Sequence, residues 1–201
     1  MILSVVFTEV KSAVKKLFSE LPEIKGERVV LKPLTSVDTD GLRELTEDEE
    51  VYRYLPTFLF EKKYEDKEYV ISRLYDECFE SSIILGVYVD DDFCGLAEMY
   101  GYRAALHKAS VGYRLLRRCW GKGIATEALG LMVKYMFEDT DIRIITASVM
   151  SENEASANVL QKNGFRQIVR IVPEDWGYDK PIPADKWLRT KSDRHLKYEF
   201  H

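Results

Sequence analysis

The spacing of hydrophobic and polar residues predicts helices and strands along most of the chain. Helical periodicity and helix-start signals predict helices at 9–18, 35–50, 63–79 and 121–137. A fifth helix is expected from the capping-box pattern Ser151-x-x-Glu154 to the C-cap signal Asn163-Gly164.

Short β-branched or alternating runs predict the strands. We expect strands at 28–34, 82–89, 93–102, 108–116, 142–149, 165–172 and 195–200. Asp90-Asp91-Asp92 marks a hairpin turn, residues 51–61 an aromatic loop, and the proline-rich residues 173–194 an irregular segment. The pattern predicts a mixed α/β (α+β) domain with a twisted, largely antiparallel sheet flanked by helices.

Length and composition fit one globular domain. The chain has 201 residues, 46% of them hydrophobic and 31% charged, without repeats or linkers. We expect a helical extension over 1–25 and a single domain over 26–201. No apolar run approaches the roughly 20 residues of a membrane span, and 1–7 lacks the features of a signal peptide. The three cysteines and three histidines show no metal-ligand spacing, so we expect a cytoplasmic protein with reduced thiols and no metal.

Charge is divided unevenly between the two halves. Residues 1–100 hold 12 bases and 22 acids, whereas residues 101–201 hold 17 bases and 12 acids. The acidic net charge of −5 argues against nucleic acid as a partner. The division favours an anionic ligand on the second half and a cationic one on the first, although chance alone also divides charges in this way.

The string from Leu115 to Ala128 carries the most informative chemistry. A strand ends there, a loop with Gly121 and Gly123 follows, and an amphipathic helix begins. Free N–H groups at a helix start and glycines without Cβ atoms form a typical phosphate cradle. The string fits neither GxGxxG nor GxxxxGK[ST], so it predicts neither a dinucleotide site nor a P-loop.

Arg118-x-x-Gly121-x-Gly123 resembles the Q/R-x-x-G-x-G/A acetyl-CoA signature of the GNAT superfamily of N-acetyltransferases. The resemblance extends over about residues 26–171 and is closest to the RimJ/RimL branch of ribosomal-protein N-acetyltransferases. The further similar strings are Gly26–Leu34, Val51–Pro56, Val111-Gly112-Tyr113, Trp120–Gly123, Ala125–Ala128, Asn153-x-x-Ser156 and Val159-Leu160-x-Lys162-x-Gly164-Phe165.

The resemblance implies a GNAT fold, in which two strands splay apart, helped by a bulge, and hold acetyl-CoA. The pantetheine arm is then expected on the backbone of Leu115 and Leu116. The pyrophosphate is expected on the motif that Arg118 opens, at the N–H groups of Gly121, Lys122, Gly123, Ile124 and Ala125.

Three further residues match the family but have ordinary structural alternatives. Asn153 is expected to touch the pantetheine arm, or else it only starts a helix. Lys162 can meet a CoA phosphate or the negative end of its helix. Glu127 matches the family, yet an acid in a first helical turn is common for structural reasons.

Amine acetylation needs a neutral amine, and therefore a base, because amines titrate near about 8 to 10. Glutamate bases of the wider superfamily would align near Ser110 or Ser148, so Glu98 is the mid-strand candidate. The tyrosine acid of many members aligns with Leu160, so Ser156, one turn earlier, is the candidate acid. A solvated strand residue and a capping serine are the structural alternatives for Glu98 and Ser156.

The resemblance thus predicts an acetyl-CoA-dependent N-acetyltransferase that acts on a primary amine by direct transfer. The acceptor is left open between a protein N-terminus, a polyamine, an amino acid and a drug amine. We expect a cationic acceptor near 47–50 and 51–61, with Tyr52 and Tyr54 as cleft walls or as core residues. A non-catalytic CoA-binding or sensor module is the alternative, and the N-terminal helix either covers the core or closes a homodimer.

Overall fold

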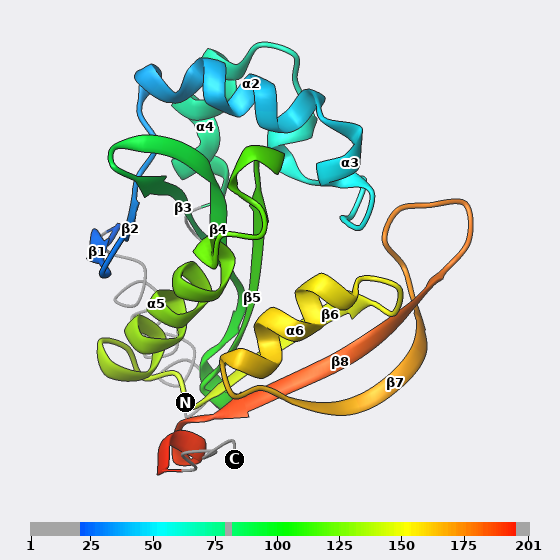
Figure 1. Cartoon of the computed structure of the whole chain (residues 1–201). Helices are drawn as coiled ribbons and strands as arrows, with labels where there is room; N and C mark the ends of the chain where they lie inside the picture. Colours follow the sequence, from blue (N-terminus) through cyan, green and yellow to red (C-terminus); the bar gives the residue numbers. More distant parts are fainter. Residues whose placement is uncertain (1–20, 79–81, 196–201) are drawn as a thin grey trace, which may run out of the picture.

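The computed structural model describes residues 21–78 and 82–195, which form an eight-stranded sheet with helices on both faces (Figure 1). The strand order is β1-β2-β3-β4-β5-β6-β8-β7, and every neighbouring pair is antiparallel except β5 and β6. The strands are β1 (Ile24–Lys25), β2 (Val29–Lys32), β3 (Ser82–Val89), β4 (Asp92–Arg103), β5 (Lys108–Leu115), β6 (Ile144–Met150), β7 (Arg166–Glu174) and β8 (Ile182–Thr190). The helix predicted at 9–18 lies outside the described residues. Because Ile24–Lys25 pairs with β2, the sheet begins before the expected boundary at residue 26.

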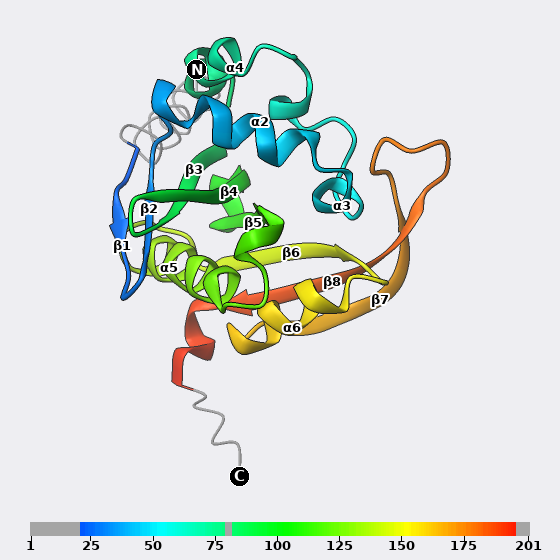
Figure 2. The ribbon, with the colours of Figure 1, turned by 45° about the horizontal axis from the view of Figure 1, so that its top comes forward.

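Helices cover the two faces of the sheet in two groups (Figure 2). One face carries α2 (Thr39–Glu47), α3 (Glu49–Tyr52) and α4 (Lys67–Cys78), and the other carries α5 (Ile124–Glu138) and α6 (Glu154–Lys162). Short 3₁₀ turns join them: η1 (Ser36–Asp38), η2 (Phe60–Lys62), η3 (Ala104–Leu106), η4 (Arg117–Cys119) and η5 (Lys191–His195). None of the described helices is long and apolar enough to cross a membrane.

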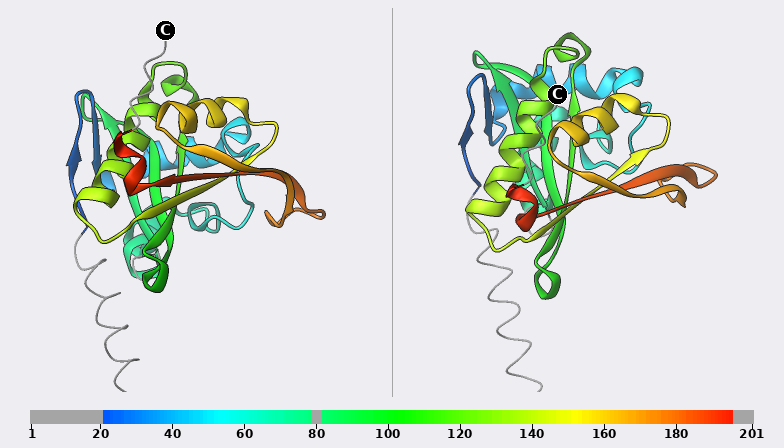
Figure 3. Two further views of the ribbon diagram at one scale, coloured as in Figure 1. Left: turned by 90° about the horizontal axis from the view of Figure 1, so that it is seen from below. Right: turned by 60° about the horizontal axis from the view of Figure 1, so that its bottom comes forward.

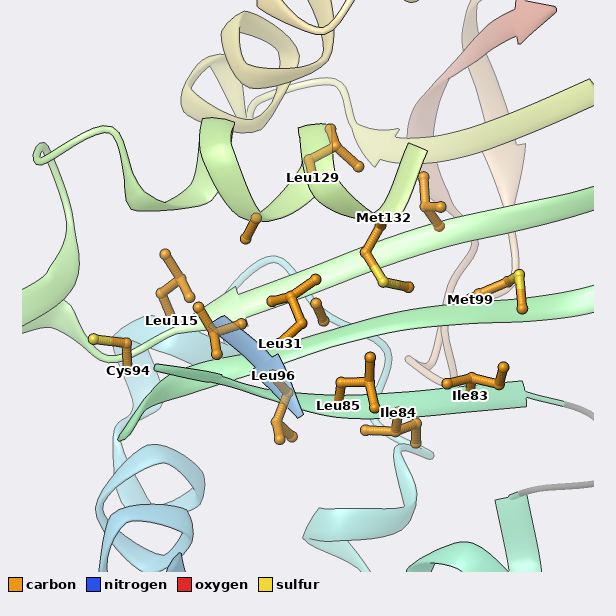
Figure 4. Close-up of a cluster of buried hydrophobic side chains, with 14 of the residues drawn as sticks. Leu31, Ile83, Ile84, Leu85, Cys94, Leu96, Met99, Leu115, Leu129 and Met132 are labelled. Carbon is orange, nitrogen blue, oxygen red and sulfur yellow. The ribbon is translucent and has the colours of Figure 1, made fainter. Parts of the chain in front are cut away.

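The core lies where α5 packs on the middle of the sheet (Figure 4). Leu129 and Met132 of α5 lie above Leu31 of β2, and all three are at most 2% exposed. Strand β3 is buried at every position except Val89, because helices cover both of its faces. This rigid centre fixes the strands on which the candidate site is built.

Two helix predictions differ from the structure for local reasons. The helix predicted over 35–50 is interrupted at Asp48, which has extended backbone and accepts a hydrogen bond from the Glu50 N–H as the cap of α3. The predicted capping box at Ser151 is wrong, because Asn153 caps α6 and accepts from the Ser156 N–H at 3.1 Å. The Ser151 hydroxyl instead donates to Asp185.

The prediction of an irregular segment at 173–194 is wrong. This region holds β8, which lies between β6 and β7 and extends with β7 as a long hairpin (Figure 3). The prolines that suggested irregularity, Pro173 and Pro183, face each other near the outer end of that hairpin. His195, the first residue of the strand predicted at 195–200, ends η5, and the rest of that predicted strand lies outside the described residues.

Strands β5 and β6 separate soon after they begin to pair. Their parallel ladder joins Lys108, Ala109 and Ser110 of β5 to Ile144, Ile145 and Thr146 of β6. Beyond these pairs β5 stays on β4 and β6 stays on β8. The β4–β5 ladder is regular from Gly95–Leu115 to Tyr100–Ser110, and its register shifts between Tyr100 and Arg103, next to the point where β5 leaves β6.

Candidate active site

A cavity of about 930 Å³ lies at the divergence of β5 and β6. Its walls come from β4, β5, β6, the start of α5, residues of α6 between 155 and 162, the α3–η2 segment and the end of β7. The cavity therefore reaches from the glycine loop on one face of the sheet to the aromatic 51–61 segment on the other. A ligand in it would cross the sheet at the split.

The glycine loop has the backbone that its sequence requires. Gly121 and Gly123 have φ values of 70° and 79°, and Gly123 is the N-cap of α5. A Cβ placed on Gly121 would meet no atom within 4 Å, so glycine is needed there for its φ and leaves open space in front of the loop. The first N–H groups of α5 have no partner within the helix and face a site that fits an anion.

An Arg28–Glu127 clamp holds the first turn of α5 against the β1–β2 turn. Glu127 accepts from the N–H groups of Arg28 and Val29 at 2.7 and 3.0 Å, and from the Arg28 side chain at 3.2 Å. Burial opposes ionisation of Glu127, but these donors outweigh it and hold its pKa below the ordinary value. Arg28 also donates to the Lys122 carbonyl, so the structural alternative for Glu127 is the one that these contacts favour.

The ten predicted cofactor residues divide into two groups. Seven line the cavity: Leu115, Gly121, Gly123, Ile124, Ala125, Asn153 and Lys162. The other three, Leu116, Arg118 and Lys122, are not among its lining residues. Arg118 donates to Glu44 at 2.6 Å and to the Phe93 carbonyl at 2.9 Å, which turns its side chain toward α2 and β4.

Strand β5 meets the glycine loop through Trp120. The indole N–H of Trp120 donates to the Leu115 carbonyl at 2.7 Å, while the Leu116 N–H donates to the Cys94 carbonyl. Trp120 is 47% exposed and lines the cavity. It therefore fixes the loop on the end of β5 while remaining half-exposed at the cavity.

Ser156 lies on the glycine-loop side of the opening, next to Tyr113 of β5. The Tyr113 hydroxyl donates to the Ser156 Oγ at 3.2 Å, which leaves the Ser156 proton available to a further acceptor. Burial raises the pKa of Tyr113, so this phenol stays protonated near neutral pH. Sequence reasoning missed Tyr113, although it belongs to the quoted Val111-Gly112-Tyr113 string.

Glu98 lies on the opposite side of the opening and leans over Gly112 of β5. A Cβ on Gly112 would lie 2.8 Å from the Glu98 Oε1, so the glycine makes room for the carboxylate. The Glu98 Oε2 is 3.3 Å from the Arg114 Nη1. Glu98 is thus a cavity residue with a 14% exposed side chain and not a solvated strand residue.

Arg114 is buried between two carboxylates. Its Nε lies 2.5 Å from the Glu61 Oε1, which also accepts from the Tyr52 hydroxyl at 2.9 Å. Burial disfavours the charged guanidinium, but Glu61 and Glu98 outweigh burial and raise the pKa of Arg114. The cluster links the 51–61 segment to β4 and β5, and Tyr52 takes part in it as a buried residue.

Glu174 brings a second carboxylate to the opening from the end of β7. It is bound by Ser148, by Lys186 at 2.5 Å and by the Trp176 indole at 3.0 Å. Burial opposes its ionisation, but the hydrogen bonds from Lys186 and Ser148 outweigh burial and hold its pKa below the ordinary value. Sequence reasoning missed Glu174 because this region was predicted to be irregular. Ser148 of β6 is one of the positions where the wider superfamily would carry a glutamate base, and Glu174 brings a carboxylate to that position from β7.

The part of the cavity around Glu98 and Glu174, here called the acceptor chamber, is bordered by two segments that are distant in sequence and joined by hydrogen bonds. The Thr57 N–H donates to the Trp176 carbonyl at 2.9 Å, and the Tyr178 hydroxyl donates to the Leu55 carbonyl at 3.0 Å. Within residues 21–78 and 82–195, His, Cys, Asp and Glu side chains form no group of three that could hold a metal ion.

The split sheet, the glycine loop and the cavity between them define an acetyltransferase of the GNAT type. A model of the acetyltransferase (GNAT) domain matches residues 28–166, and the chain belongs to this family. The resemblance to the RimJ/RimL branch is confirmed as well, because ribosomal-protein N-acetyltransferases are among the proteins that the chain matches. The protein is an enzyme of the N-acetyltransferase class.

Individual relatives match different lengths of the chain. The probable N-acetyltransferase YjcK of Bacillus subtilis is 40% identical over 79 residues, which is 39% of this chain and 44% of that protein. The uncharacterized N-acetyltransferase YoaA of the same species is 27% identical over 82% of this chain and 93% of its own. Mycobacterium smegmatis RimJ, solved in complex with a CoA disulfide, has a TM-score of 0.72 at 23% identity and covers 83% of this chain and 84% of its own.

Proposed function

We propose that the protein transfers an acetyl group from acetyl-CoA directly to a primary amine at the divergence of β5 and β6. One observation carries this proposal: a single cavity joins the glycine loop to Glu98 and Glu174. A donor held on one face of the sheet and an acceptor held on the other would meet at the split. Direct transfer forms the N–C bond as the C–S bond breaks, the amine loses a proton and the thiolate gains one.

The residues of the glycine loop fit the phosphates of acetyl-CoA. Both glycines have positive φ, and open space lies in front of Gly121. The N–H groups of residues 121–125 would hold the pyrophosphate, although Arg118 and Lys122 would contribute only main chain. The edge of β5 that β6 leaves unpaired, ending at Leu115, would align the pantetheine arm, with Asn153 beside it and Lys162 at the far end of α6.

We propose Glu98 as the base. Arg114 engages its Oε2, while Oε1 points over Gly112 at the edge of β5, where the thioester would lie. Glu174 is the second candidate, but three donors already occupy its carboxylate. A proton taken by Glu98 leaves the amine neutral and nucleophilic.

Ser156 is the proposed donor to the leaving thiolate. Tyr113 donates to Ser156, so the serine proton is free to point at the sulfur and the pair can act as a relay. Ser156 also lies in the first turn of α6, whose positive end favours an anionic sulfur. The alternative role for Ser156, capping of the helix, is performed by the Asn153 side chain.

The test is an acetyl-CoA turnover assay with a panel of primary amines, read by thiol release and by the mass of the acetylated product. Amine-dependent release of CoA with matching acetylated product is the expected result. A folded protein that binds acetyl-CoA but releases no CoA with any amine would be the non-catalytic CoA-binding or sensor module. The presence of two carboxylates and a hydroxyl pair around the opening favours the enzyme. A cytoplasmic location is also proposed on the basis of the sequence, whereas the sequence leaves both a monomer and a homodimer open.

A further inference from the structure

The acceptor side of the cavity has more carboxylates than basic groups. Glu98, Glu61 and Glu174 line it, and two more acidic residues, Glu50 of α3 and Asp175 after β7, line the same cavity. Among the described lining residues the basic ones are Arg114 and Lys162, and Lys162 lies at the end of α6 on the other face. The acceptor chamber therefore has a negative potential.

One oxygen of a buried carboxylate in this wall lacks a hydrogen bond. The Glu61 side chain is 1% exposed; its Oε1 is paired with Arg114 and Tyr52, but its Oε2 has no hydrogen-bond partner among the described residues. Lys67 lies near Glu61, but its ammonium donates to the main-chain carbonyls of Glu61 and Tyr64 at 2.8 and 2.7 Å. The charge of Glu61 is therefore only partly compensated, and it adds to the field that attracts a cationic ligand in the chamber.

Among the described residues that line the acceptor side, no basic side chain is left unpaired to hold a substrate carboxylate. The positive charge of Arg114 is shared by Glu61 and Glu98, and that of Lys186, behind the wall, is taken by Glu174. An amino acid would therefore bring an unpaired carboxylate into a negative site. This argues against one of the acceptor classes that the sequence leaves open.

Aromatic rings complete the chamber. Tyr54, Tyr100 and Trp176 line it, and aromatic faces attract ammonium groups and alkyl chains alike. The Thr57–Trp176 and Tyr178–Leu55 hydrogen bonds join the two segments at its outer side. A short flexible amine could place its ammonium groups against the carboxylates and its alkyl chain against these rings.

We propose that the acceptor is an aliphatic diamine or polyamine. The reacting amine lies at Glu98, and the second positive charge is bound by the carboxylates farther out, Glu50 and Asp175, between the aromatic rings. This inference rests on the proposed acetyltransferase function and adds the class of its acceptor.

The direct test compares three acceptors with the same four-carbon chain: diaminobutane, butylamine and γ-aminobutyrate. We expect kcat/KM for diaminobutane to exceed that for butylamine by about tenfold or more, the effect of one charge-assisted contact. We expect γ-aminobutyrate to be the poorest of the three. A diamine-to-monoamine ratio of about two, the statistical value for two equivalent amines, would overturn the inference while leaving the acetyltransferase function intact.

Paired variants locate the second charge. Glu50→Gln and Asp175→Asn should each lower the diamine-to-butylamine ratio, whereas the controls Glu49→Gln and Asp179→Asn, which are exposed and outside the cavity lining, should keep it. An equal ratio in all four variants would contradict the placement. A peptide with a free N-terminus that gives a kcat/KM tenfold above every diamine would overturn the acceptor class. Failure of every amine to release CoA would instead remove the proposed function itself.

Discussion

The two ends of the cavity are built from different parts of the protein. The glycine-loop end is built on the main chain of the loop and of the first turn of α5, with Gly121 and Gly123 at positive φ. The acceptor end uses side chains from α3, η2, β4, β5, β6 and β7. The phosphates of an acetyl donor can be held by peptide N–H groups. Binding of the amine acceptor depends instead on charged side chains that several distant elements bring together.

Replacing the proposed base tests the acceptor end most strongly. Glu98→Gln keeps the shape and the contact with Arg114 but cannot accept a proton, so kcat should fall about 100-fold or more. Glu174→Gln should cause a smaller loss in kcat, with a higher KM for the amine. Steady-state kinetics with one amine measures both, and the reverse ranking would move the role of base to Glu174.

Ser156→Ala tests the hydroxyl pair at the opening. If Ser156 protonates the thiolate, kcat should fall about 100-fold while the affinity for acetyl-CoA stays close to wild type. Tyr113→Phe removes the donor to Ser156 and should give a smaller loss in the same direction. Because Asn153 caps α6, thermal stability should be nearly unchanged in Ser156→Ala. A variant with full kcat would remove the catalytic role.

Gly123→Asp tests the glycine-loop end. A side chain and a negative charge beside the phosphates, at a φ of 79°, should weaken acetyl-CoA binding by about tenfold or more. Calorimetric titration of the folded variant measures this effect. Gly164→Asp is the matched control, since Gly164 has a φ of 72° and is not a cavity-lining residue. Equal affinities in the two variants would contradict the phosphate cradle.

Glu127→Gln should produce the smallest effect. It tests whether Glu127 stabilises the fold without taking part in the reaction. Loss of the charged acceptor for Arg28 and Val29 should cost about 1 kcal/mol of unfolding free energy near neutral pH, with kcat nearly unchanged. Because the folded-state pKa is lowered, the stabilisation is present above the ordinary glutamate pKa of about 4.3 and is lost as pH falls through the folded value. Denaturant unfolding at several pH values checks this, with Glu154→Gln as the control. A difference between wild type and variant that grows on acidification would contradict it.

The sequence predicted the parts of the fold that depend on local patterns. Strand 82–89 and the hairpin turn at Asp90–Asp92 are found as predicted, and α5 begins at Ile124, directly after the glycine pair. The family and its enzymatic class followed from ordered motifs and are confirmed by the match over residues 28–166. The spacing of neighbouring residues was sufficient for these predictions, because each motif lies within one strand–loop–helix unit.

The parts that were missed depend on contacts between distant segments. Strand β8 carries Pro183 and alternates weakly, so only its pairing with β6 and β7 makes it a strand. Glu174 became a site residue through Ser148 and Lys186, and Tyr113 through Ser156. The outward turn of Arg118 follows from Glu44 on α2, a partner that no local motif names.

The central claim is that the donor and the acceptor meet where β5 leaves β6. A crystal structure of the protein with CoA tests it most directly. We predict the pyrophosphate on the N–H groups of residues 121–125, the pantetheine arm along β5, and the sulfur within hydrogen-bond distance of Ser156, on the path to Glu98. A CoA whose phosphates lie away from the glycine loop, or whose sulfur lies outside the β5–β6 opening, would contradict the account.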